Sequence, residues 1–204
     1  VRGNTFLHPG LRLSVDFPRG WEVTNGQRQV IAKQPEGKAV VLLQTVQRVI
    51  GRNIDEIAQR SMAGAGLQMV DGSRTSINGL EAFVGTYQGS LQSLGRVTIR
   101  AAHIVRDRDF WLVAGIAPQD AYDRVEPDLT KSVTSFRALT AGEAETIRPN
   151  RVGLYSARQG DSWQSIAERE GRGAVKPTTL AIMNGRAVND QPRPGERLKI
   201  VVGG

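Results

Sequence analysis

The chain contains no cysteine, which excludes disulfides, thiol catalysis and cysteine-type zinc sites. It has only two histidines, His8 and His103, and neither begins an H-E-x-x-H motif. That motif places two zinc ligands and a general base on one helix face, so a catalytic zinc site is disfavoured. Two histidines also make a Ser-His-Asp triad hard to assemble. We therefore expect no catalytic residues, no metal site and no cofactor in this chain.

Long apolar runs are also missing. The longest, such as Ala39–Leu43, are far too short to span a bilayer. The sequence starts at Val1 without an initiator Met and without a charged-then-apolar signal segment. We therefore expect it to belong to a longer protein whose targeting information lies upstream.

Acidic residues are fewer than basic ones, and the net charge is +7. The excess is uneven: residues 148–204 hold ten Lys and Arg against five Asp and Glu. A basic C-terminal module suits a polyanionic neighbour such as cell-wall polymer, anionic lipid or nucleic acid. The arginines are scattered singly and few aromatics lie near them, so an ordinary solvated surface is the simpler interpretation. The same pattern disfavours nucleic acid as a partner.

The first two thirds of the chain show the alternation of half-buried strands. Leu11–Phe17 alternates strictly, and Asn25-Gly26 and Asn78-Gly79 are strong hairpin signals. Further strands are predicted at Trp21–Thr24, Arg28–Gln34, Ala39–Val46, Met69–Ile77, Leu80–Gly89, Gly95–Val105 and Phe110–Ala117.

Two segments have helical periodicity instead. Asn53–Gly66 carries an apolar stripe and has Asn53 as its N-cap. Pro118–Phe136 is the second, with Pro118 suited to its start and Pro127 expected to break or kink its first turns. Together these patterns predict an α+β domain, an antiparallel sheet packed with two helices, over residues 1–140.

A polar linker is predicted at residues 141–151, with order ending near Thr140–Gly142 and Pro149 opposing any helix. A small β-α-α-β module then fills residues 152–204. A strand at Tyr155–Ala157 and a turn at Gly160 precede the first helix, and Asp161 or Ser162 can cap it. Asn184-Gly185 ends a second helix, and Arg197–Val202 closes as a strand.

The module resembles the LysM family in three blocks: Gly160-Asp161-Ser162-Trp163, Met183-Asn184 and Pro194-Gly195-Glu196-Arg197-Leu198-Lys199-Ile200. It departs from the family in having Trp163 where Leu is usual and a longer connection between Ala167 and Asn184. The resemblance implies binding of peptidoglycan or another glycan containing N-acetylglucosamine, in a groove of backbone amides. Carried onto this sequence, the groove comprises Gly160, Asp161, Ser162, Trp163, Met183, Asn184, Gly185 and Arg186.

Trp163 has two interpretations. An exposed indole would be a stacking platform for a sugar ring. Alternatively, Trp163 and Met183 fill a very small core that needs large side chains.

The first domain resembles the PsbP-like family, on the run Leu13–Trp21 and on a final helix that ends in Ser135-Phe136. PsbP-like domains are scaffold and accessory domains without a shared activity. The two domains in this order resemble the C-terminal region of bacterial zinc metallopeptidases of the HtpX and CAAX-protease type.

That resemblance implies a non-catalytic accessory region in the periplasm or cell envelope, with zinc only in an upstream protease domain. Its partners would be the glycan, that protease domain and an envelope protein. The alternative is a LysM-like module that has lost sugar binding and docks intramolecularly or on a protein partner to regulate the protease.

Overall fold

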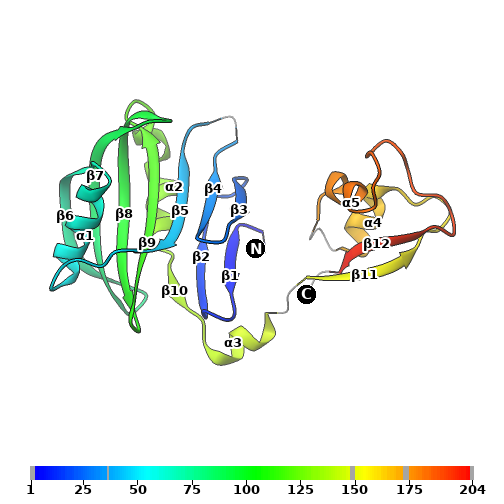
Figure 1. The fold of residues 1–204 in the computed structure, drawn as a ribbon, viewed down its shortest axis with the longest axis horizontal. Helices are drawn as coiled ribbons and strands as arrows, with labels where there is room; N and C mark the ends of the chain where they lie inside the picture. Colours follow the sequence, from blue (N-terminus) through cyan, green and yellow to red (C-terminus); the bar gives the residue numbers. More distant parts are fainter. Residues whose placement is uncertain (1–2, 36, 148–149, 172–174, 203–204) are drawn as a thin grey trace. The chain divides into compact units, whose positions relative to one another are not determined.

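The computed structural model describes residues 3–35, 37–147, 150–171 and 175–202. They form two compact units, Val1–Ala144 (unit 1) and Glu145–Gly204 (unit 2), shown in Figure 1. Some sequence-based predictions lie partly outside the described residues. These are the outer ends of the domains predicted at 1–140 and 152–204, Pro149 of the linker, and residues 172–174 of the long connection.

Unit 1 is built on a seven-stranded antiparallel sheet in the order β3-β4-β5-β9-β8-β7-β6. Its strands are β3 (Glu22–Asn25), β4 (Gln29–Lys33), β5 (Val40–Thr45), β6 (Gln68–Ile77), β7 (Leu80–Leu91), β8 (Gly95–Arg106) and β9 (Asp109–Pro118). A smaller sheet of β1 (Thr5–His8), β2 (Leu13–Asp16) and β10 (Arg137–Ala138) has β2 in its centre.

Two helices pack on opposite faces of the large sheet (Figure 1). Met62 of α1 (Ile54–Gly64) joins a cluster with Ala101, whereas Leu129 of α2 (Tyr122–Val133) joins one with Ala102. Adjacent residues of a strand point to opposite faces, so the two helices enclose the sheet between them. The predicted α+β class is therefore confirmed. None of the described helices is long and apolar enough to cross a bilayer.

The local signals for two of these elements are confirmed. The side chain of Asn53 accepts the N–H of Glu56 at 3.0 Å, which makes it the N-cap of α1. Asn78 and Gly79 both have positive φ, +49° and +83°, and join β6 to β7 as a two-residue turn.

The prediction for the second helix was wrong at its start. Pro118 ends β9, where it pairs with Val97, and α2 begins only at Tyr122. Pairing across the sheet therefore places Pro118 in a strand, although a proline also suits the first turn of a helix. Pro127 does not end the helix, which continues to Val133, although a proline there removes the backbone bond to the carbonyl of Asp123.

The predicted linker is not irregular throughout, because α3 (Ala141–Thr146) lies within it. Thr140 and Glu143 form a reciprocal capping pair. The Thr140 hydroxyl accepts the Glu143 N–H at 3.1 Å, and the Glu143 carboxylate accepts the Thr140 N–H at 2.8 Å. The expectation that order ends near Thr140–Gly142 is therefore wrong.

Unit 2 has the predicted β-α-α-β order, with β11 (Arg151–Ser156), α4 (Trp163–Arg169), α5 (Pro177–Met183) and β12 (Arg197–Val202). The two strands pair antiparallel, with Tyr155 opposite Leu198. Both helices supply the core, which gathers Ala157, Trp163, Ile166, Ala167, Leu180, Ala181, Leu198 and Ile200.

Candidate functional site

Two loops of unit 2 carry most of the residues predicted to bind a glycan. The first loop (157–162) joins β11 to α4, and the second loop (184–196) joins α5 to β12. Backbone hydrogen bonds join their ends, from Ala157 N–H to the Glu196 carbonyl at 2.9 Å and from Gly195 N–H to the Ala157 carbonyl at 2.7 Å. The structure thus joins the start of the first loop to the end of the second.

Trp163 is buried, with 1% of its surface exposed. Of its two interpretations, the exposed stacking platform is therefore wrong and the core residue is confirmed. Its indole fills the core of unit 2 and its Nε1–H donates to the Asp190 carbonyl at 2.8 Å. Its backbone N–H donates to the Gln191 side chain at 3.1 Å. A core this small needs a large side chain at its centre, and here that side chain also fastens the second loop to α4.

Asp161 holds the first loop closed. Its carboxylate accepts the Tyr155 hydroxyl at 2.6 Å and the Arg158 N–H at 2.7 Å, and it pairs with Arg169 at 3.0 Å. The hydrogen bond from Tyr155 is the largest cause that lowers the pKa of Asp161, to about 2, and the Arg158 N–H adds to it. Only 5% of this side chain is exposed, so Asp161 shapes the loop rather than offering a carboxylate to a ligand.

Ser162 caps α4 through a reciprocal box. Its hydroxyl accepts the Ser165 N–H at 3.1 Å, and the Ser165 hydroxyl accepts the Ser162 N–H at 2.9 Å. Gly160 makes the preceding turn at φ +83°, and a Cβ there would meet no atom within 4 Å. The backbone of this turn therefore faces open space.

Asn184 and Arg186 hold the second loop. The Asn184 amide donates to the Lys199 carbonyl at 2.8 Å and accepts the Lys199 N–H at 2.7 Å, which ties the end of α5 to β12. Arg186 pairs with Glu196 at 2.7 Å and with Asp190 at 2.8 Å. Between them Gly185 turns at φ +69°, again with open space where a Cβ would lie.

The most exposed apolar side chain beside these loops is one that the sequence analysis missed. Ile182 is 72% exposed, whereas Met183 is half-buried. The signal was available, since a residue two positions after Leu180 cannot share its face of a helix.

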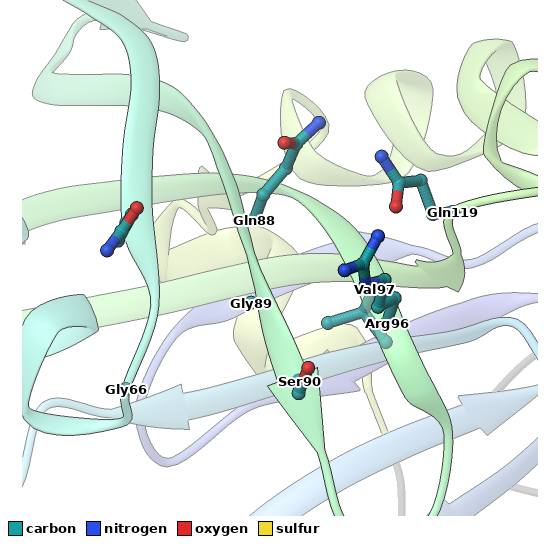
Figure 2. A pocket seen from close by; sticks show the side chains of 8 residues that line it. Gly66, Gln88, Gly89, Ser90, Arg96, Val97 and Gln119 are labelled. Atoms are coloured by element: carbon teal, nitrogen blue, oxygen red, sulfur yellow. The ribbon is translucent and has the colours of Figure 1, made fainter.

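Unit 1 holds a separate polar hollow of about 330 Å³. It is lined by Gly66, Gln68, Gln88, Gly89, Ser90, Arg96, Val97 and Gln119. Figure 2 shows the side chains of Gln88, Arg96 and Gln119 gathered from β7, β8 and the residue after β9. No motif in the sequence pointed to this place.

The two histidines offer no site together. Both ring nitrogens of His103 are buried without a partner, and burial lowers the pKa of His103 to about 4. The Nδ1 atom of His8 accepts the Leu11 N–H at 3.0 Å. Across the described residues, no three His, Asp or Glu side chains form a group that could hold a metal ion.

No protein-family model and no curated protein matches the sequence. Among solved structures, the chain is similar to cyanobacterial PsbP (CyanoP) from Synechocystis sp. PCC 6803, with 12% identity, a TM-score of 0.49 and coverage of 66% of this chain and 91% of that one. It is also similar to LpqN of Mycobacterium tuberculosis, involved in cell envelope biogenesis, with 11% identity, a TM-score of 0.45 and coverage of 69% and 87%. The α+β class of unit 1 rests on its own sheet register and helix packing, not on these likenesses.

Proposed function

We propose that this chain is a non-catalytic accessory region of an envelope zinc metalloprotease, in which unit 2 binds peptidoglycan or another glycan containing N-acetylglucosamine. Unit 1 serves as an interaction scaffold, and zinc belongs to an upstream catalytic domain. The β-α-α-β order and the three sequence blocks that resemble LysM modules support this assignment.

The observation that carries the proposal is that the two loops are fastened before any ligand arrives. Trp163 bonds the second loop through both of its N–H groups, and Asp161 and Asn184 hold the loops from within. Loops that are already ordered lose little conformational entropy when they bind a sugar.

Sugar recognition then falls on backbone groups, because most of the predicted side chains are engaged within the fold. The turns at Gly160 and Gly185 have no side chain to cover their backbone, and a Cβ at either glycine would meet open space. The Gly185 N–H already donates to the Ile182 carbonyl at 2.9 Å, so the carbonyl groups and the Gly160 N–H are the groups left for a sugar. Backbone donors and acceptors of this kind suit the N-acetyl amide of the sugar. Ile182 supplies the apolar surface, a role that one of the two interpretations of Trp163 had offered for the indole.

Cosedimentation of the intact chain with purified peptidoglycan tests the proposal. We expect the chain to pellet with the polymer and Ile182→Asp to bind it roughly thirtyfold more weakly, since a charge replaces an apolar contact of about 2 kcal/mol. Leu154→Asp is the matched control, because Leu154 is 66% exposed on β11, outside the two loops. Failure of the unaltered chain to pellet would refute glycan binding.

A second function, docking on a protein, is favoured by a different face of unit 2. Val152 and Leu154 are 67% and 66% exposed and alternate along β11 on the side away from the core. Two large aliphatic side chains on one open face suit a protein contact. If unit 2 is a docking arm alone, Leu154→Asp abolishes recovery of the protease domain in a pull-down. Neither Leu154→Asp nor the unaltered chain then pellets with peptidoglycan.

A further inference from the structure

The polar hollow of unit 1 lies where β7 extends beyond the end of its neighbour β6. The first pair between β6 and β7 is Gln68 with Gln88, but β7 continues beside β8 to Leu91. Residues 89–91 therefore border β8 on one side and have no strand on the other within the described chain. The hollow of about 330 Å³ occupies this end of the sheet (Figure 2).

One wall of the hollow is set by close backbone packing. A Cβ at Gly89 would lie 2.8 Å from Cδ2 of Leu67 and 2.9 Å from the Gly66 carbonyl oxygen. Gly66 itself turns at φ +75°, which favours glycine. Because glycine at both places lets the chain entering β6 lie directly against β7, the wall does not depend on flexible side chains.

The side chains around the hollow have hydrogen-bonding capacity that the protein does not use. Three are amides, one is a hydroxyl and one is a guanidinium, and none of the five has a side-chain hydrogen bond or ion pair with a described residue: Gln68, Gln88, Gln119, Ser90 and Arg96. Arg100, on the same face of β8, differs, because it bonds Thr86 at 2.8 Å and Asp71 at 3.3 Å. Arg96 is therefore the cation that this hollow offers.

We propose that the hollow binds a saccharide unit that carries one carboxylate. Each amide can donate and accept, as sugar hydroxyls do, and a guanidinium can hold a carboxylate through two parallel hydrogen bonds. Val97 is the single apolar side chain in the lining and no aromatic ring takes part, so an acyl chain or a nucleobase would gain little there. The volume lies at the small end of ligand pockets, which span about 300–1,000 Å³.

Charge-matched sugars test this proposal on the intact chain. D-glucuronate and D-galacturonate would be titrated against D-glucose, D-galactose and acetate, with amide NMR shifts as the readout. We expect saturable shifts at Gly66, Gln88 and Ser90 with the two acids. The neutral sugars and acetate should bind at least roughly tenfold more weakly than the acids. The neutral sugars lack the carboxylate, and acetate lacks the sugar hydroxyls.

Arg96→Gln should reduce binding of the acids at least tenfold, to the level of the neutral sugars. Arg108→Gln is the matched control, since Arg108 is exposed in the turn at the opposite end of β8, and it should leave binding unchanged. Neither side chain has a hydrogen bond or ion pair with a described residue to lose, so both variants should fold. Shifts that persist in Arg96→Gln, equal binding of acetate, or no saturable shift with either acid would each overturn the proposal. The proposal is independent of glycan binding by unit 2, whose loops carry separate amide signals.

Discussion

The two units are stabilised differently, unit 1 mainly by a large apolar core and unit 2 by a small core together with polar contacts. Unit 1 buries side chains on both faces of a seven-stranded sheet, and its large core tolerates His103 with two unpartnered ring nitrogens. In the part of unit 2 that the structure describes, eight buried hydrophobic residues, including Trp163, form one cluster, and polar contacts from Asp161, Ser162 and Asn184 fix the loops. A small domain buries a smaller share of its surface, so each contact in unit 2 carries more of its stability. The polar contacts that hold unit 2 together also shape its candidate binding loops.

The largest expected difference comes from removing the central side chain of each unit. Trp163→Ala should cost about 3–5 kcal/mol and unfold unit 2, because so small a core has little stability to spare. Leu129→Ala should cost about 2–5 kcal/mol in unit 1 and leave it folded. Amide NMR resolves the signals of each unit in the same urea titration.

Trp163→Leu keeps a large apolar side chain at this position and serves as the control for Trp163→Ala. It should keep unit 2 folded with a smaller loss. Loss of unit 1 signals in Trp163→Ala would contradict the independence of the two units.

Acid should destabilise the units over different pH ranges. The pKa of His103 is about 4 in the folded chain and near 6.5 when unfolded, so the unfolded chain binds more protons between these values. Unit 1 therefore keeps this contribution in full above pH 6.5 and loses up to about 3 kcal/mol as pH falls toward 4. Urea unfolding at stepped pH measures it, and His103→Leu should flatten the response.

Unit 2 contains no histidine, and its lowered pKa is that of Asp161. The contribution of Asp161 is present above the unfolded pKa of 3.8 and is lost as pH falls through about 2. An equal loss of stability in unit 2 between pH 6.5 and 4 would refute this contrast.

The smallest expected effect comes from removing one helix N-cap side chain in each unit. Asn53→Ala and Ser162→Ala each remove an N-cap side chain, at about 1 kcal/mol. The absolute losses should be similar, but Ser162→Ala should lower the melting temperature of unit 2 more steeply, since a smaller unit has a smaller unfolding entropy. Differential scanning calorimetry of the two variants measures both transitions, and equal shifts would contradict the comparison.

Much of the fold could be predicted because its signals are local. Strand alternation, the Asn78-Gly79 turn and the Asn53 cap each depend on a few adjacent residues, and all are found in the structure. The start of α2 could not be predicted locally, because it depends on Pro118 pairing with Val97 across the sheet. The helix α3 could have been predicted from Thr140 and Glu143, whose spacing is that of a capping box.

The candidate site was harder to predict than the fold. The positions of the loop residues follow from the order of elements, but whether Trp163 faces the core or the solvent depends on packing among α4, α5 and β12. The roles of Asp161 and Asn184 depend on contacts with Tyr155 and Lys199, which no short motif encodes. The hollow of unit 1 arises because β7 extends beyond the end of β6, which depends on how the strands pair.

The most direct test of glycan binding by unit 2 is an amide NMR titration of the intact chain with a chitin oligomer. Binding at the two loops predicts saturable shifts at Gly160, Ile182 and Gly185, with Trp163 remaining buried and bonded to Asp190. Shifts that are absent from 157–162 and 184–196 at saturating oligomer would contradict it.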